Sequence, residues 1–245
     1  MNDLNHVAFI MDGNGRWGIK KKKDRNYGHI KGVDTVKKIV KFSIKFQIPI
    51  ITFYVFSSEN WKRPKKEINF LFKLIKVYFI KEIENIKKQG IKLNIFGEKN
   101  KIPSDTNYVL KKACELTKKN NKIIVNLAIN YGSRKEIFNV SKKIKKFKDI
   151  KSFEKNLYTK NMPFPDILVR TGGHQRLSNF MLWQLAYAEI FFIKKLWPEF
   201  KGSDLLKIIK QYKKIKRNFG TVWLKKISKF AYIHLQFYYF FYFLW

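Results

Sequence analysis

Four short polar segments concentrate the arginine, glycine and carboxylate side chains of this chain. They cover residues 12–17, 57–64, 130–134 and 170–179, and three of them contain glycine. Only seven of the 52 basic residues are arginine, and most of these arginines belong to the polar segments. Arginine binds phosphate or carboxylate through two parallel hydrogen bonds, which lysine does not do, so this placement indicates sites for anions.

The first segment combines one carboxylate with two glycines. Gly13 and Gly15 allow backbone N–H groups to approach an anion closely. Asp12 is the only acid of the segment, and a single carboxylate suits a magnesium ion that takes other ligands from phosphate groups. A simple Asp-Gly turn explains the same spacing equally well. The segment is neither a nucleotide-binding P-loop nor a dinucleotide fingerprint.

The last segment carries two arginines ahead of an apolar stretch. We expect Ser178 to cap a helix through residues 181–185, with Arg170 and Arg176 beside its first turn. Such a helix start binds a diphosphate, although an ordinary cap with two surface arginines has the same sequence. Glu189 stands between apolar neighbours, where a carboxylate is paired or bound to metal. It is a candidate second magnesium ligand or, alternatively, a surface glutamate at a helix end.

Strands separated by helices must position these segments. The helix pattern is clearest over residues 67–89, with Gly90 as its C-terminal cap. Continuous apolar runs between helices predict a mostly parallel sheet covered on both faces, within a single α/β domain. Ligands bind beyond the carboxyl ends of such strands, so the polar segments are expected to converge at one edge of the sheet. About six strands are predicted, at residues 7–11, 50–56, 91–96, 123–129, 167–169 and 190–193.

Composition limits the classes of protein that the chain can belong to. Its 245 residues suit one domain, and its single cysteine, Cys114, excludes a disulfide framework. No signal peptide is recognised, so a cytoplasmic location or association with a membrane surface is expected. The net charge of +34 raises the alternative of a basic nucleic-acid-binding protein. Because the lysines are scattered along the whole chain, we attribute them to compositional drift and expect no nucleic-acid partner.

Several segments together resemble the signatures of the cis-prenyltransferase family, which includes undecaprenyl diphosphate synthase. Residues 6–17 read HVAFIMDGNGRW and residues 56–64 read FSSENWKRP, and both are similar to family signatures. Further matches are residues 27–29, 165–192, 196–200 (LWPEF) and 217–220 (RNFG), in family order. This resemblance implies a catalytic domain over residues 1–220, followed by an aromatic extension of unknown role over residues 221–245. Departures are His174 and Gln175, where the family more often has a glutamate, and Ser133, which replaces a usual glycine.

The resemblance implies an enzyme that joins isopentenyl diphosphate to an allylic diphosphate, usually farnesyl diphosphate, with Mg2+ as cofactor. Asp12 and Glu189 are expected to hold the metal. Asn60 occupies the position that the family assigns to proton removal. Because an amide is a poor base, we expect Asn60 to orient the reacting groups or to relay the proton. The remaining residues implied to bind substrate are Gly13, Asn14, Gly15, Arg16, Trp17, Arg25, His29, Ser57, Ser58, Glu59, Trp61, Arg63, Arg170, Arg176, Leu177 and Ser178.

The resemblance also implies a product and an assembly. The expected product is a long polyprenyl diphosphate, at family level undecaprenyl diphosphate for a cell-wall lipid carrier, delivered to the membrane by a homodimer. An apolar product needs an apolar channel, and Phe70, Leu71, Leu74, Ile75, Tyr78 and Phe79 are candidates for lining it or for ordinary core. The rival within the family is a non-catalytic partner subunit, which would have lost the loop acid or the arginines.

Overall fold

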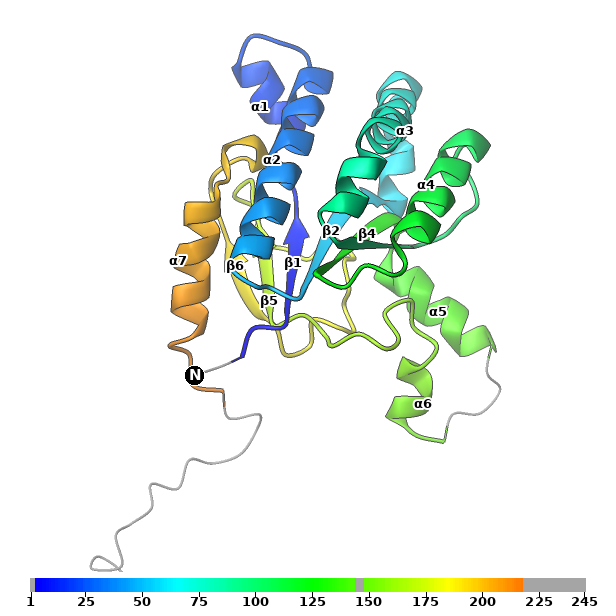
Figure 1. Cartoon of the computed structure of the whole chain (residues 1–245), viewed down its shortest axis with the longest axis vertical. Coiled ribbons are helices and arrows are strands. Elements are labelled where there is room, and N and C mark those ends of the chain that lie inside the picture. Colours follow the sequence, from blue (N-terminus) through cyan, green and yellow to red (C-terminus); the bar gives the residue numbers. More distant parts are fainter. Residues whose placement is uncertain (1–2, 144–147, 218–245) are drawn as a thin grey trace, which may run out of the picture. The chain divides into compact units, whose positions relative to one another are not determined.

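The protein is built around a six-stranded parallel sheet, shown in a computed structural model that describes residues 3–143 and 148–217 (Figure 1). The sheet order is β3-β4-β2-β1-β5-β6, and every neighbouring pair is parallel. This arrangement confirms the predicted fold class, and all six predicted strands are present. The strands are β1 (His6–Ile10), β2 (Ile50–Ser57), β3 (Ile91–Phe96), β4 (Ile123–Tyr131), β5 (Ile167–Arg170) and β6 (Glu189–Phe192).

Helices connect the strands and cover both faces of the sheet. Val7 and Phe9 of β1 pack with the α2, α3, α4 and α7 side, whereas Ala8 and Ile10 join the opposite cluster, with Phe180 and Met181. This alternation follows from the two-residue period of a strand, and it explains the unbroken apolar sequence of β1. The helices are α1 (Asn14–Lys20), α2 (Arg25–Lys45), α3 (Lys65–Lys88), α4 (Ser104–Thr117), α5 (Ser133–Lys143), α6 (Ile150–Glu154) and α7 (Gly202–Tyr212), with 3-10 turns η1 (Ser58–Lys62) and η2 (Trp197–Glu199).

The two long helices α2 and α3 begin at the carboxyl edge of the sheet. Asp24 caps α2, since its side chain accepts a hydrogen bond from the Tyr27 N–H at 2.8 Å. The α3 helix starts directly after Pro64 and ends before Gly90, which adopts a left-handed φ of 72°. The predicted helix and its glycine cap are therefore confirmed.

The segment after β5 differs from the prediction. Residues 177–188 form a series of turns and not a helix, so Ser178 caps nothing. Ser178, Asn179 and Met181 have φ values of 49°, 62° and 45°, which lie in the left-handed region and prevent a continuous right-handed helix. The apolar spacing that suggested a helix instead places Phe180, Met181 and Leu185 in the core beneath the sheet.

The chain divides into two units, Met1–Lys213 and Lys214–Trp245. The sheet and all helices named above belong to the first unit. The predicted aromatic extension, residues 221–245, lies outside the described residues.

Trp197 anchors the turn after β6 to the core. Its side chain is fully buried, its ring centroid lies 5.9 Å from that of Phe9, and its indole N–H donates to the Gly32 carbonyl at 2.9 Å.

We expect Trp197→Ala to lower the free energy of unfolding by about 3–5 kcal/mol, because a large cavity remains. Urea denaturation measures this loss. Tyr108→Ala is the control, since Tyr108 is 67% exposed, and an equal loss in both variants would contradict the assignment.

Candidate active site

A polar pocket of about 620 Å³ lies at the carboxyl ends of β1, β2 and β5. Five arginines but only two carboxylates, Asp12 and Glu59, line it. Three of the four polar segments meet here, as the parallel topology predicts, whereas residues 130–134 are not part of the pocket lining. The predicted site residues that line the pocket are Asp12, Gly13, Asn14, Gly15, Arg16, Arg25, His29, Ser57, Glu59, Asn60, Arg63, Arg170, Arg176 and Ser178.

Asp12 is held between two arginines at the end of β1. Its Oδ1 lies 3.2 Å from Arg16 Nη2, and its Oδ2 lies 3.1 Å from Arg170 Nη2. Arg170 is almost fully buried and also donates to the Ser178 hydroxyl at 2.8 Å and to the Arg176 carbonyl. The Arg170 guanidinium therefore fixes both the carboxylate and the loop that carries Arg176, in addition to supplying positive charge.

Two glycines, Gly15 and Gly172, leave room for the guanidinium groups of Arg25 and Arg16. A Cβ on Gly15 would lie 2.6 Å from the Arg25 guanidinium carbon, so any side chain there would displace Arg25. Gly172 has φ of 88°, and a Cβ there would lie 2.5 Å from Arg16 Nη2. Glycine is required at both positions because guanidinium groups occupy the space of a side chain.

Glu67, in the first turn of α3, joins three of the cationic side chains and was missed by the sequence analysis. Its carboxylate receives two hydrogen bonds from Arg25, at 3.0 and 3.1 Å. Arg63 Nη1 and His29 Nε2 each lie 3.2 Å from its Oε1. A glutamate amid lysines at a helix start is typical of a solvated capping residue, and only its spacing of four from Arg63 could have indicated an ion pair.

The electrostatics of this cluster set the charge states of its members. Burial raises the pKa of Glu67, but hydrogen bonds and charges from Arg25, Arg63 and His29 outweigh burial and hold the pKa below its ordinary value. Burial lowers the pKa of His29, and the opposing attraction of Glu67 does not compensate. Near neutral pH the free protein therefore holds a charged Glu67 beside a neutral His29.

The second polar segment forms the wall opposite Asp12. Asn60 Oδ1 accepts a hydrogen bond from the Ser57 N–H at 3.2 Å, which fixes the amide on the η1 turn. Glu59 accepts from Asn179 Nδ2 at 2.8 Å, and its pKa is lowered because its hydrogen bonds outweigh its burial. The wall is thereby tied to the turns that follow β5.

Some predicted substrate-binding residues do not line the polar pocket. Trp17 stacks on Tyr27 with centroids 5.8 Å apart, and the Trp61 indole donates to Asn130 at 2.7 Å. Ser58 and Leu177 also lie outside its lining. The departure at Ser133 has a structural role, because its hydroxyl accepts a hydrogen bond from the Leu182 N–H at 3.0 Å.

The structure does not bring Glu189 and Asp12, the two predicted metal ligands, together within a single chain. The strand register places Glu189 level with Ile167 and Val7, at the amino end of the sheet. The carboxyl end of β1, at Ile10, is already three residues or about 10 Å further along. A magnesium ion binds ligands at about 2.1 Å, so it cannot bridge these carboxylates. The sequence analysis placed Asp12 directly after a strand, but it placed Glu189 directly before the strand predicted at residues 190–193, so the two residues stand at opposite ends of their strands.

The polar pocket fits a magnesium ion only together with an anionic ligand. Among residues 3–143 and 148–217, no group of three or more His, Cys, Asp or Glu side chains could hold a metal. Asp12 offers a carboxylate that is partly exposed toward the pocket, with its side chain 27% accessible. Magnesium commonly binds one or two carboxylates plus phosphates and water, so this donor set is compatible with it.

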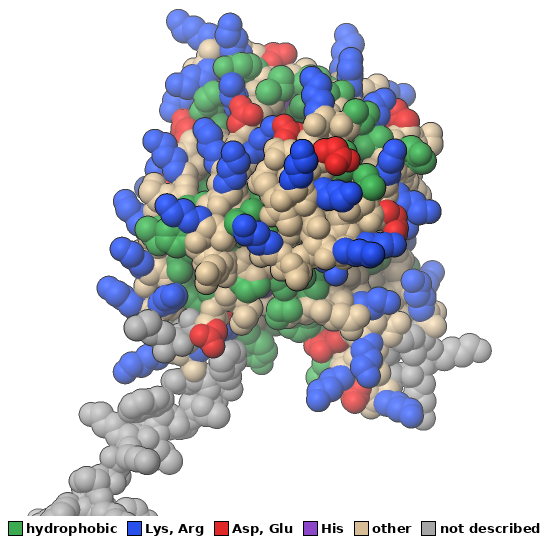
Figure 2. Space-filling model, in the orientation of Figure 1, with side chains coloured by type: hydrophobic (Ala, Val, Ile, Leu, Met, Phe, Trp, Pro, Cys, Tyr) green, Lys and Arg blue, Asp and Glu red, His purple; other side chains and the backbone are tan. Residues whose placement is uncertain are grey.

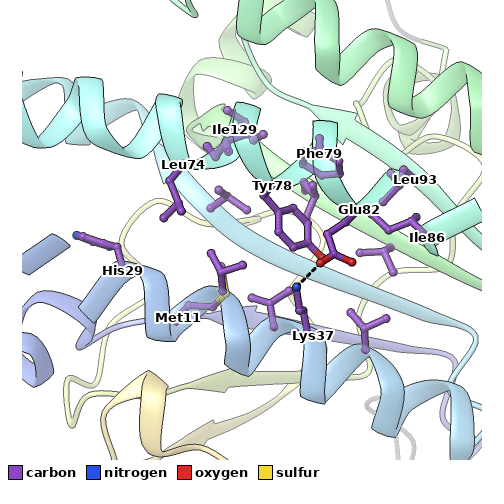
Figure 3. Close-up of a pocket in the computed structure, with 18 of the residues that line it drawn as sticks. Met11, His29, Lys37, Leu74, Tyr78, Phe79, Glu82, Ile86, Leu93 and Ile129 are labelled. Atoms are coloured by element: carbon purple, nitrogen blue, oxygen red, sulfur yellow. Dashed lines mark hydrogen bonds and ion pairs between the residues drawn. The ribbon is translucent and has the colours of Figure 1, made fainter. Parts of the chain in front are cut away.

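An apolar pocket of about 290 Å³ adjoins the polar one between α2, α3 and the sheet (Figure 3). The two pockets are adjacent, because they share five lining residues: Met11, Asn14, His29, Val55 and Leu71. Five of the six predicted channel residues on α3 line it, and Phe70 does not. The site thus combines a cationic chamber with an apolar slot.

The surface outside the pockets shows no single basic face in the view of Figure 2. Lysine and arginine side chains are dispersed over that face between hydrophobic and neutral groups, which agrees with their scatter along the sequence. Within the described ranges, the helices are too short or too polar to cross a membrane.

Replacement of Glu67 tests its place in the cluster. We expect Glu67→Gln to lower the free energy of unfolding at pH 7 by about 2 kcal/mol, since hydrogen bonds between charged groups are lost. The folded pKa of Glu67 is depressed, so its contribution is complete above about pH 4.5 and is lost as pH falls through the folded pKa. The difference between native and variant protein should therefore shrink below pH 4.5, as measured by urea denaturation. The control is Glu115→Gln, which removes an exposed ion pair with Lys118 and should change the free energy of unfolding little. If the difference in unfolding free energy between native protein and Glu67→Gln did not depend on pH, the assigned role of Glu67 would be contradicted.

Comparison with known proteins identifies the family. The family model described as "Putative undecaprenyl diphosphate synthase" matches residues 10–220. The isoprenyl transferase of Oceanobacillus iheyensis is 42% identical over 231 residues, covering 90% of this chain and 92% of that protein. The isoprenyl transferase of Rickettsia bellii is 43% identical over 224 residues, covering 90% of this chain and 99% of that protein.

Two solved structures share the fold. Lavandulyl diphosphate synthase from Lavandula x intermedia, in complex with dimethylallyl diphosphate, has a TM-score of 0.84 at 32% identity, covering 89% of this chain and 98% of that one. A probable undecaprenyl diphosphate synthase from Campylobacter jejuni has a TM-score of 0.77 at 33% identity, covering 90% and 100%. With this sequence, this sheet and this cationic pocket, the chain belongs to the undecaprenyl diphosphate synthase family and is a prenyl-transferring enzyme.

Proposed function

We propose that the protein condenses isopentenyl diphosphate with an allylic diphosphate, such as farnesyl diphosphate, in cis to give a long-chain polyprenyl diphosphate. The observation that carries this proposal is that the two pockets are adjacent and share five lining residues. One is lined by five arginines, which suit two diphosphate groups, and the other is apolar and suits an isoprenoid chain. Undecaprenyl diphosphate for a cell-wall carrier, a homodimeric enzyme and delivery of product to the membrane are the corresponding finer proposals.

The reaction needs positive charge where the allylic C–O bond breaks. The electron pair of that bond leaves with the diphosphate, and Arg16, Arg25 and Arg63 are placed to stabilise the charge that grows there. The double bond of isopentenyl diphosphate forms the new C–C bond with the allylic carbon. A proton then leaves the condensed chain and restores a double bond. Asn60, fixed by the Ser57 N–H, is placed to orient the reacting groups beside this step.

The second diphosphate is assigned to the loop after β5. Arg176 and Ser178 line the pocket beside Arg170, which the Asp12 carboxylate holds in place. Asp12 is the residue that would hold Mg2+ together with diphosphate oxygens. The metal would supply charge neutralisation for the leaving group.

The catalytic proposal is favoured over a non-catalytic partner subunit by the residues retained in the pocket. The loop acid Asp12 and five arginines are present together in one chamber. Incubation with farnesyl diphosphate, labelled isopentenyl diphosphate and Mg2+, with products sized by chromatography, tests it. We expect extraction of labelled long-chain lipid, and absence of any labelled product from well-folded protein would reject the proposal.

Removal of the loop carboxylate tests the metal assignment. We expect Asp12→Ala to reduce turnover by at least about 100-fold, because charge stabilisation at the leaving group is lost. Initial rates with excess Mg2+ measure the effect, and circular dichroism checks that the fold is retained. Turnover close to that of the native protein would remove Asp12 from the mechanism.

Replacement of one arginine by lysine tests recognition of isopentenyl diphosphate. We expect Arg176→Lys to raise KM for isopentenyl diphosphate about tenfold with a smaller change in kcat, since lysine keeps the charge but loses the fork of donors. Steady-state kinetics with each substrate varied in turn separate the two sites. An equal rise in KM for the allylic substrate would show that the assignment of Arg176 to one subsite is wrong.

A further inference from the structure

An ion pair crosses the apolar pocket where no charge is needed for the chemistry described above. Lys37 of α2 extends across to Glu82 of α3, with Nζ and Oε1 separated by 2.5 Å (Figure 3). Both side chains line the apolar pocket. Charged groups in a slot for hydrocarbon are costly unless they are paired, so their presence requires an explanation.

The pair is held firmly by its neighbours. Lys37 Nζ lies 5.1 Å from the ring centroid of Tyr78, and Glu82 Oε2 accepts a hydrogen bond from Asn85 at 3.1 Å. Hydrogen bonds from Lys37 and Asn85 lower the pKa of Glu82, so it remains a carboxylate. The pair is therefore a charged link between two helices, and it keeps contact with solvent, since the Lys37 and Glu82 side chains are 36% and 25% accessible.

This crossing is one of two polar links between α2 and α3 in the described part of the chain. The other joins Arg25 and His29 to Glu67, at the polar end of the slot. Along α3, Glu67 and Glu82 are 15 residues or about 22 Å apart, and apolar residues such as Leu74 line the pocket between them. The slot also continues beyond the pair, where Ile86 and Leu93 line it (Figure 3).

A growing hydrocarbon chain meets two obstacles at this crossing. It would have to separate Lys37 from Glu82 or remove the water that still reaches both side chains, and taking water from a charged group is unfavourable. The pocket of about 290 Å³ is also at the small end for ligand sites, so a long chain must spread α2 and α3 apart. The ion pair opposes that separation because it links the two helices.

We propose that the Lys37–Glu82 pair is a specificity-determining feature that limits product length by closing the apolar slot to further growth of the chain. The inference rests on the proposed prenyl-chain elongation. It assigns to these two residues a function in selecting where elongation stops, without contact to either diphosphate.

The test compares product lengths made by three variants and the native enzyme. Lys37→Met with Glu82→Gln keeps the size of both side chains and removes both charges. Lys76→Met with Asp105→Asn is the matched control, because that pair has the same 2.5 Å separation and also starts from α3, but neither residue lines the pocket. Lys37→Glu with Glu82→Lys exchanges the charges and can restore the link.

We expect the uncharged variant to shift the main product by at least one isoprenyl unit toward longer chains. The control and the exchanged pair should keep the native distribution, as read by chromatography of dephosphorylated products. An unchanged or shorter distribution in the uncharged variant, with labelled isopentenyl units still incorporated, would overturn the inference alone. Long products from the exchanged pair would equally overturn it, since the link would then not set the length. No incorporation by the native enzyme would reject the proposed function and this inference with it.

Discussion

The carboxylate of Glu67 determines how the cationic wall of the polar pocket is built. Arg25 and His29 lie one turn apart at the start of α2, Arg63 follows the η1 turn, and all three side chains reach Glu67 within 3.2 Å. Without an anion between them, the guanidinium groups of Arg25 and Arg63 would repel one another. Glu67 therefore preorganises donors in the absence of substrate, so that less reorganisation is needed when a diphosphate binds.

The same two helices serve opposite chemical needs along their length. Near the sheet edge, α2 presents Arg25 and His29 to the polar pocket, and Glu67 of α3 holds both side chains. Further along, apolar side chains such as Val36, Leu74 and Ile75 line the slot before Lys37 and Glu82 are reached. Diphosphate ionisation needs fixed charge, whereas an isoprenoid chain needs a surface without it. In the proposed reaction, this arrangement would place the reacting carbon at the boundary between the charged and the apolar part of the two helices.

The sequence predicted what local patterning controls and missed what tertiary geometry controls. The strands and the glycine-bearing segment at Asp12 follow from short apolar runs and from turn chemistry, and the structure contains them. Glu67 was missed because its partner Arg25 lies 42 residues away, a separation that no periodicity reveals. The helix predicted after Ser178 is wrong because left-handed residues interrupt it. The separation of Glu189 from Asp12 within one chain was missed because it depends on how the strands align in the sheet.

The composition of the chain gives independent support to the polar pocket as the functional centre. Lysine outnumbers arginine several-fold in the whole sequence, yet the described lining of the polar pocket contains five arginines and no lysine. Drift toward lysine would replace arginine wherever a single positive charge is sufficient. A single positive charge is not sufficient at Arg25, because two nitrogens of its guanidinium group donate hydrogen bonds to the two oxygens of Glu67 at once. A lysine offers one point charge and cannot reproduce that geometry, so the requirement for paired donors, more than the need for charge, has preserved arginine at this site.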